Sequence, residues 1–551
     1  MENVQNSKVN RWIRVIPIGV VVCIAILFRF YSLNTIPPSP SLDEVSIGYN
    51  AFSILKTGAD EYKHRFPLLL RAYDDWRPAL YVYIVLPFVS LFGLTPLAVR
   101  LPSVILSTGT VILTYALFQL FFKRYVVSII AIALLAISPW HVYISRLGHE
   151  VNLGLLLVLS GIYFFFISLV SRKSRKMLLF SAISFSLSFY AYQSQKIITP
   201  LTILCLLILY WNDLMKSKLY VIVSLLTGIL VVTPLLLISI NPAVSMRLQK
   251  TSVFSDHPLY ISTDILLRQA RQGGDIVAQL QYSRKITTLK IFIQNYLVHF
   301  SPQWLFWGGD NERHKVSGMG LLYPWEIPFI IIGLISLWRS TIDKRKKIFI
   351  VAWFFISPLP GALTTEAPHA MRTYSFLPLW QFFTAYGVYY IYTLFQRKIE
   401  RTIFIGILCS IFVFSGYTLF IQYFSIFPVK QSGSFQYTLP LALAYTIEHE
   451  NEYNTIIVSN QENLYQSYMY YLFYSKYDPR QYHFSGGTYS GGYDETHAIG
   501  KYEFRPIVWE KEQFDKGILF VGNIKDFPYN VGEKATYTLL NGQEAIKIIS
   551  R

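Results

Sequence analysis

The sequence predicts a polytopic α-helical membrane protein with about eleven transmembrane helices, interfacial helices in its external loops and a C-terminal external α/β domain. Three observations predict this class. Of the 551 residues, 53% are hydrophobic and 15% are charged, whereas soluble domains average about 25% charged residues. The apolar residues gather in runs of the roughly 20 residues that a helix needs to cross a bilayer. Basic residues stand in short clusters between these runs, as they do in cytoplasmic loops.

Eleven apolar runs are predicted to cross the membrane. The first follows a basic amino terminus with Lys8, Arg11 and Arg14. Because many more runs follow it, we interpret it as a signal-anchor helix rather than a cleaved signal peptide. The predicted spans are residues 13–33, 97–122, 126–144, 151–171, 177–192, 196–212, 219–240, 324–340, 347–363, 373–395 and 402–424.

A twelfth apolar run, 79–93, is short and follows the polar stretch 74–78. If it crossed the membrane, the basic clusters at 123–124, 172–176 and 216–218 would lie outside, against the positive-inside rule. If it stays in the interface, these clusters lie inside, together with those at 344–347 and 397–401. Charge bias therefore predicts a multi-pass cell-membrane protein with a cytoplasmic amino terminus and an external carboxyl terminus.

This topology leaves three substantial external pieces. The first is the loop from about 34 to 96, and the second is the connection 241–323, where 290–307 is amphipathic and aromatic, as in a helix lying in the interface. The third begins at about 430, which divides the chain into a transmembrane domain, 1–429, and an α/β domain, 430–551. In that domain we expect helices at 438–450 and 462–475, strands at 455–459 and 518–522, and a Gly- and Tyr-rich linker at 486–493.

Several function classes lack sequence support. The net charge of +17 does not form a basic stripe on a soluble face, so no nucleic-acid partner is predicted. The chain has no Walker loop, no GxGxxG that opens a helix, no HExxH and no cysteine pair suited to zinc. ATP-driven transport and dinucleotide chemistry are therefore not expected. Charged residues gather at the external ends of spans rather than at mid-membrane, which argues against an ion-coupled transporter.

Two adjacent carboxylates, Asp43 and Glu44, follow a proline-rich segment just outside the first span. Paired acids at the mouth of a membrane cavity suit a general base, a metal ligand or both. The alternative is structural, because Asp43 is also suited to cap a helix that begins near Glu44. The spacing alone leaves these two interpretations open.

Other polar residues recur at the predicted external ends of spans. Each alone is more often an interface anchor or a snorkelling side chain. Their shared side is informative, because Arg and Lys that face a membrane-level cavity can hold a lipid phosphate. The residues are His141, Arg146, His149, Glu150, Tyr192, Lys196, His369 and Arg372.

In this order, several segments resemble the bacterial branch of glycosyltransferase family 39. They are Asp43-Glu44, the stretch Arg77-Pro78-Ala79-Leu80-Tyr81 and the stretch Arg100-Leu101-Pro102-Ser103. The stretches at 138–146 and 368–372 are similar to segments of uncharacterised bacterial members. The family includes protein O-mannosyltransferases and lipid A aminoarabinose transferases, and it has the GT-C membrane fold. The resemblance covers roughly residues 10–425, and the tail after 430 carries no motif.

The resemblance implies transfer of a sugar from a polyprenyl-phosphate-linked donor to an acceptor hydroxyl on the external face, with inversion. It implies that Asp43 is the general base and that Glu44 orients the acceptor or supports a metal. From their shared side we assign the donor phosphate to Arg146, Lys196, His369 and Arg372. The residues expected to line the acceptor site or the cavity are Asp74, Asp75, Arg77, Tyr81, His141, His149, Glu150 and Tyr192.

Several points stay open at the level of sequence. The acceptor is a protein, a lipid or a glycan, and a divalent metal has only Asp43 and Glu44 as candidate ligands. Arg77 stands where the aminoarabinose branch tends to have Lys. The first alternative function is a lipid-linked-glycan flippase or other transporter, which needs polar residues along a path through the bilayer. The second is a membrane scaffold, which leaves Asp43 and Glu44 without a common purpose.

Overall fold

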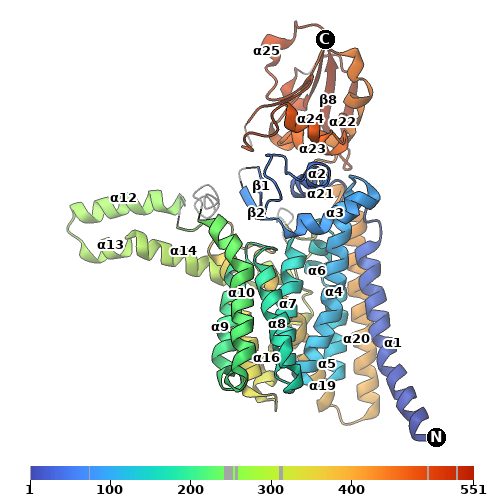
Figure 1. The fold of residues 1–551 in the computed structure, drawn as a ribbon, viewed down its shortest axis with the longest axis vertical. Coiled ribbons are helices and arrows are strands. Elements are labelled where there is room, and N and C mark those ends of the chain that lie inside the picture. Colours follow the sequence, from blue (N-terminus) through green and yellow to red (C-terminus); the bar gives the residue numbers. More distant parts are fainter. Residues whose placement is uncertain are drawn as a thin grey trace. The chain divides into compact units, whose positions relative to one another are not determined.

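The structure is a computed structural model that describes residues 2–73, 75–240, 252–254, 258–308, 314–492, 495–528 and 531–551 (Figure 1). By their internal contacts the residues divide into two compact units. Unit 1 comprises Met1–Phe28, Ser107–Ile144 and Leu153–Leu419, and unit 2 comprises Arg29–Leu106, Ser145–Asn152 and Phe420–Arg551.

Each predicted span coincides with a helix or with two consecutive helices. Short connections join the helices between residues 96 and 239, and one of them, the helical turn Lys173–Lys176, carries a predicted basic cluster. The helices are α1 (Glu2–Phe30), α4 (Pro96–Phe122), α5 (Tyr125–Ala136), α6 (Pro139–Ser145), α7 (Val151–Ser168), α8 (Met177–Ser188), α9 (Gln195–Leu214), α10 (Lys218–Ser239), α16 (Glu326–Arg339), α17 (Lys344–Ile356), α18 (Leu359–Ala362), α19 (Leu379–Leu394) and α20 (Lys398–Phe420).

Fewer helical stretches meet a strict test of length and apolarity for crossing a membrane. Among the described residues, four do so: Pro96–Phe122, Val151–Ser168, Gln195–Ser239 and Lys398–Gln431. The pair α5 and α6, which is bent by 55°, is a fifth if the two helices form one span. The helices support a multi-pass membrane protein, and the count of eleven crossings remains a prediction.

Close helix packing in unit 1 depends on small residues, as is usual between membrane helices. Helices α16 and α19 meet at Gly333 and Gly387. A Cβ atom on Gly333 would lie 1.9 Å from the carbonyl oxygen of Phe383, and one on Gly387 would lie 2.0 Å from that of Phe329. Any larger side chain at either position would therefore separate the two backbones.

Three helices of the predicted external connection project away from α9 and α10 (Figure 1). They are α12 (Pro258–Gln272), α13 (Ile276–Gln281) and α14 (Arg284–Val298). Val253, Tyr260 and Ile291 form a small buried cluster that joins α12 to α14. The expected interfacial helix at 290–307 thus begins earlier, at Arg284, and the short helix α15 (Pro302–Phe306) follows it.

The outward face of α14 is aliphatic. Ile286, Leu289, Ile293 and Leu297 follow the helical period and are 38%, 50%, 45% and 60% exposed. We predict that this face contacts lipid. A Cys at position 289 that carries an environment-sensitive fluorophore should be quenched by lipids brominated on their acyl chains, whereas a Cys at Gln294, on the flank of the same helix, should be quenched less. Equal quenching at the two positions would contradict the prediction.

Unit 2 contains the first predicted external loop. Helix α2 (Leu42–Thr57) leads to an antiparallel hairpin of β1 (Leu69–Ala72) and β2 (Asp75–Pro78), and helix α3 (Leu80–Phe92) follows. The 13 residues of α3 are too few to cross a bilayer, which agrees with an interfacial position for the run 79–93.

The C-terminal residues of unit 2 form a mixed six-stranded sheet in the order β4-β5-β3-β6-β8-β7. The expected strands are its central pair, β3 (Thr455–Val458) and β6 (Ile518–Asn523), which run parallel and are almost entirely buried. The expected helices are α22 (Thr438–Glu448) and α23 (Ser467–Tyr474), and a short helix α24 (Pro479–Phe484) follows α23. The other strands are β4 (His497–Ile499), β5 (Tyr502–Phe504), β7 (Ala535–Thr538) and β8 (Glu544–Ser550).

Candidate functional site

The start of helix α2 explains the role of the serine before the acidic pair. Ser41 is the N-cap: its hydroxyl accepts a hydrogen bond from the backbone N–H of Glu44 at 3.3 Å. The Glu44 carboxylate in turn accepts one from the backbone N–H of Ser41 at 2.7 Å. This reciprocal pair is a capping box. The structural interpretation that made Asp43 the cap is therefore wrong, and its carboxylate is not needed to begin the helix.

The buried carboxylate of Glu44 forms an ion pair and backbone hydrogen bonds within unit 2. Its side chain is 1% exposed and forms an ion pair with Arg100, whose side chain is 0% exposed, at 2.7 Å between Nε and Oε1. The backbone N–H of Gly148 donates to the same oxygen at 3.0 Å. Glu44 thus joins α2, α4 and the segment 145–152. Its predicted contact with acceptor or metal stays a prediction, and the contacts seen here are structural.

Arg100 fixes the proline-rich segment before α2. Its guanidinium donates to the carbonyl oxygens of Leu33, Pro37 and Ser39 at 3.0, 3.1 and 2.9 Å. The approach of Gly148 depends on its lack of a side chain, because a Cβ atom there would lie 2.9 Å from the carbonyl oxygen of Val99.

Asp43 is the open member of the acidic pair. Its side chain is 48% exposed, and its Oδ1 lies 3.2 Å from Nη2 of Arg77, which is 6% exposed. Arg77 comes from strand β2 and also donates to the hydroxyl of Ser46 at 3.4 Å. The guanidinium therefore orients the Asp43 carboxylate from the buried side, while about half of the surface of that side chain is exposed.

His149 lies on the other side of Asp43. Its Nε2 is 3.9 Å from Oδ2 of Asp43, and its Nδ1 is 3.3 Å from Oε2 of Glu150. The backbone N–H of Val151 donates to Nδ1 at 3.3 Å. Unit 2 thus brings together five predicted residues: Asp43, Glu44, Arg77, His149 and Glu150.

The remaining predicted residues of unit 2 have contacts of their own. The hydroxyl of Tyr81 donates to the carbonyl of Val99 at 2.9 Å, and Asp75 accepts from the backbone N–H of Trp76 at 2.8 Å. The buried guanidinium of Arg146 donates to the carbonyls of Arg29 and Ile36 at 2.7 and 2.8 Å. Asp74, also predicted for this site, lies outside the described residues.

Five predicted residues belong to unit 1: His141, Tyr192, Lys196, His369 and Arg372. His141 is fully buried and its ring stacks on Tyr374. Tyr192 is also buried, and Lys196 lies half-buried in the first turn of α9.

His369 and Arg372 lie together in unit 1. The N–H of Arg372 donates to Nδ1 of His369 at 3.3 Å, and its guanidinium donates to the hydroxyl of Thr364 at 2.8 Å. The N–H of His369 donates to Nε2 of His299 at 3.2 Å. Burial lowers the pKa of His299 to about 4, so this imidazole is neutral at pH 7.

A divalent metal does not fit the donor atoms at Asp43. Among the described residues, no three His, Cys, Asp or Glu side chains gather as metal ligands. The oxygens of Glu44 are held by Arg100, Gly148 and Ser41, and Asp43 lies beside a guanidinium. Divalent cations need several oxygen ligands, so no step below is assigned to a metal.

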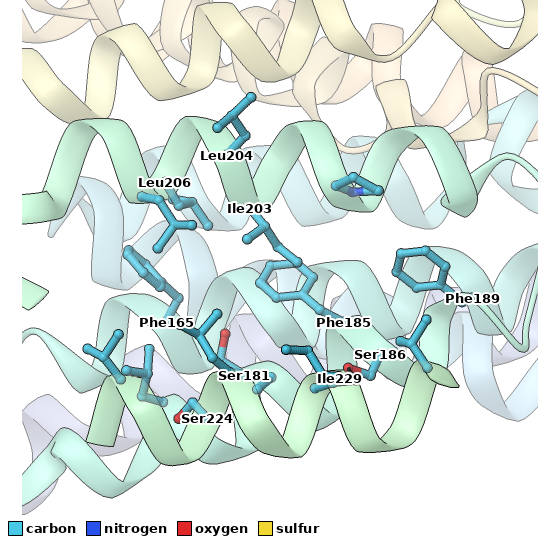
Figure 2. Close-up of a pocket in the computed structure, with 18 of the residues that line it drawn as sticks. Phe165, Ser181, Phe185, Ser186, Phe189, Ile203, Leu204, Leu206, Ser224 and Ile229 are labelled. Atoms are coloured by element: carbon cyan, nitrogen blue, oxygen red, sulfur yellow. Dashed lines mark hydrogen bonds between the residues drawn. The ribbon is translucent and has the colours of Figure 1, made fainter. Parts of the chain in front are cut away.

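A cavity of about 470 Å³ lies among α7, α8, α9 and α10 of unit 1. Figure 2 shows Phe185 of α8 and Ile203 of α9 in its lining. Each described residue that lines it is apolar or carries a hydroxyl, as at Ser181 and Ser224. This cavity suits hydrocarbon rather than acid–base chemistry.

Sequence reasoning missed two residues of these groups. Arg100 was noticed only as part of a motif, although an Arg at the external end of a predicted span needs a partner and Glu44 was available. His299 falls in the external connection, and no spacing in the sequence relates it to His369. Only the fold brings these two imidazoles together.

A family model described as dolichyl-phosphate-mannose-protein mannosyltransferase matches residues 76–238. A comparison with curated proteins gives no match. Among solved structures, ArnT from Cupriavidus metallidurans in the apo state has a TM-score of 0.56 and 9% identity, covering 98% of both chains. The same protein bound to undecaprenyl phosphate has a TM-score of 0.55 and 10% identity, covering 96% of this chain and 97% of that one.

The archaeal oligosaccharyltransferase AglB from Archaeoglobus fulgidus, in complex with an inhibitory peptide and a dolichol-phosphate, has a TM-score of 0.52 and 11% identity. The match covers 94% of this chain and 70% of AglB. At these identities the likeness establishes the fold.

Proposed function

We propose that this chain, which has the fold of the GT-C membrane glycosyltransferases, transfers a sugar from a polyprenyl-phosphate-linked donor to an acceptor hydroxyl at the external face of the membrane. The observation that carries the proposal is the half-exposed Asp43 carboxylate, oriented by Arg77 at the start of α2. The partial match to the mannosyltransferase family supports the donor class.

The proposed reaction needs one base and a leaving group. Asp43 takes the proton of the acceptor hydroxyl, and the hydroxyl oxygen attacks the anomeric carbon of the donor. The bond between this carbon and the phosphate oxygen breaks, and its electron pair leaves with the polyprenyl phosphate. Attack from the face opposite the phosphate inverts the anomeric centre. No nucleotide sugar is required, because the phosphate is already a competent leaving group.

Cationic residues complete the proposal. A departing phosphate gains negative charge, which Arg and Lys stabilise. We assign this role to Lys196, His369 and Arg372 of unit 1, as their predicted external position suggests. Arg146 was predicted for the same role, but its guanidinium is buried against backbone carbonyls, so we assign it a structural role. The charge bias of the loops supports a cytoplasmic amino terminus and an external C-terminal domain.

The first test is transfer by the purified protein from a panel of radiolabelled polyprenyl-phosphate sugars. We expect release of free polyprenyl phosphate from one donor class, with the label passing to an added hydroxyl acceptor or, more slowly, to water. Labelled donor in vesicles without protein is the control. If no donor is consumed but labelled lipid moves between leaflets of protein-containing vesicles, the flippase alternative replaces this proposal.

A further inference from the structure

A buried carboxyl group outside the Asp43 site, Glu61, connects helix α2 to the C-terminal part of unit 2. Its side chain is fully buried. One carboxylate oxygen accepts a hydrogen bond from Nδ2 of Asn50, in the middle of α2, at 2.9 Å. The other accepts from the hydroxyls of Thr488 and Tyr468 at 2.9 and 3.4 Å. The Glu61 side chain thus hydrogen-bonds both to helix α2 and to the C-terminal part of unit 2.

Further contacts hold the C-terminal part along α2. The hydroxyl of Tyr470 donates to the carbonyl of Pro40, directly before the N-cap, at 2.9 Å. At the far end of the helix, Nε2 of His483 lies 2.8 Å from the carbonyl oxygen of Asp60. Gly48 faces the ring of Phe473, because a Cβ atom there would lie 2.5 Å from it. The C-terminal part therefore contacts the middle of α2 and the residues just before and just after this helix.

We propose that Glu61 is a positioning residue for Asp43. Through Asn50, Thr488 and Tyr468 it holds the C-terminal part of the chain against α2, so that the first turn of this helix presents Asp43 in one orientation. The proposal rests on the proposed function, because positioning affects turnover only if Asp43 acts on a substrate. It assigns the C-terminal domain, which carries no motif, a part in the same site.

A second path connects Glu61 to Asp43 through charge. Arg77 interacts electrostatically with Glu61, and the same guanidinium lies 3.2 Å from Asp43. When Glu61 is ionised, its negative charge adds to those of Asp43, Glu150 and Asp75 around the same buried guanidinium. When Glu61 is protonated, this added charge is absent. The protonation state of Glu61 therefore alters the charge balance around the proposed base.

The surroundings of Glu61 set the direction of its pH dependence. Burial raises the pKa of the Glu61 carboxyl to about 7, whereas the hydrogen bonds from Asn50 and Thr488 lower it. Among the charged groups, Asp60 of the same loop raises this pKa and Arg77 of β2 lowers it. Four tyrosines interact electrostatically with Glu61: Tyr49 of α2, Tyr73 of the hairpin, and Tyr468 and Tyr482 of the C-terminal part. Three histidines lie beside its neighbours: His64 and His483 contact Asp60, and His497 stacks on Tyr468.

The direction in which docking changes with pH follows from the linkage between proton binding and docking. A carboxyl whose pKa is higher in the docked state than when exposed to water binds its proton on docking. The resulting stabilisation is full below about pH 4.5, declines as the pH rises, and is lost above about 7. Docking of the C-terminal part on α2 should therefore be tighter at pH 6 than at pH 8.

Hydrogen exchange of the full chain in detergent or nanodiscs tests this without a substrate. After correction for intrinsic exchange rates, the wild-type amides of α2 and of residues 467–488 should be better protected at pH 6 than at pH 8. Glu61→Gln mimics the protonated acid, so its protection should not change with pH. Thr488→Val removes a hydrogen bond that lowers the pKa of Glu61, so in this variant protection should decline at a higher pH than in the wild type. Glu503→Gln, at a partly exposed ion pair of the C-terminal part, is the matched control.

The pH profile of turnover supplies the second measurement. In the wild type, kcat should fall as the pH rises through about 7, and Glu61→Gln should remove this step with little change in KM. A pH step that persists in Glu61→Gln, or protection in the wild type that does not depend on pH, would overturn the inference. Because the exchange experiment needs no donor, its result stands even if no donor is found and the proposed function fails.

Discussion

Asp43→Asn should lower kcat/KM about 10²–10⁴-fold, the range that loss of a general base typically costs. Asn keeps the size of the side chain and can still contact Arg77, but it does not accept the proton of the acceptor hydroxyl. Because Ser41 rather than Asp43 caps α2, the substitution should leave the helix and membrane insertion intact. The measurement is steady-state transfer from the donor identified with the wild type.

The matched control is Glu462→Gln, which makes the same change of charge at an exposed ion pair with Lys525 in unit 2. This variant should retain wild-type turnover. If Asp43→Asn turns over as fast as the control while both are folded, Asp43 is not the base. The basic residues of unit 1 would then be the first place to seek the chemistry.

Much of the fold follows from local sequence, because long apolar helices are specified by composition and length. The predicted spans coincide with helices, and the expected strands at 455–459 and 518–522 form the centre of the C-terminal sheet. The outer strands were not predicted. Strands β4 and β5 have three residues each, too few for a period of two to show. They join the sheet through the pairing of β5 with β3, which lies far away in the sequence and which composition does not reveal.

The candidate site was predictable only in part, and for a physical reason. Asp43 and Glu44 are neighbours in the sequence, and the prolines before them mark the membrane surface. Their different surroundings arise from the tertiary structure. Helix α2 turns the Glu44 carboxylate toward Arg100 and leaves the Asp43 carboxylate about half exposed beside Arg77. Glu61 was not singled out at all, because its partners Tyr468 and Thr488 lie more than 400 residues away.

Arg100→Met should destabilise the protein by about 3–5 kcal/mol, the usual result of leaving a buried charge without its partner. The substitution strands the Glu44 carboxylate, which is 1% exposed, and frees three carbonyls of the segment before α2. The measurement is equilibrium unfolding in detergent. Arg397→Met, at an ion pair on the surface where the Arg side chain is 82% exposed, is the control and should cost about 0–1 kcal/mol.

A double-mutant cycle separates the ion pair from its surroundings. If the large cost of Arg100→Met comes from stranding Glu44, then Glu44→Gln in the same chain should recover part of it, because a neutral amide is less costly to bury than a carboxylate. Strictly additive effects would instead assign the cost to the carbonyls that Arg100 binds. In either case activity should fall with stability, since the segment that Arg100 fixes leads directly into the first turn of α2 and into Asp43.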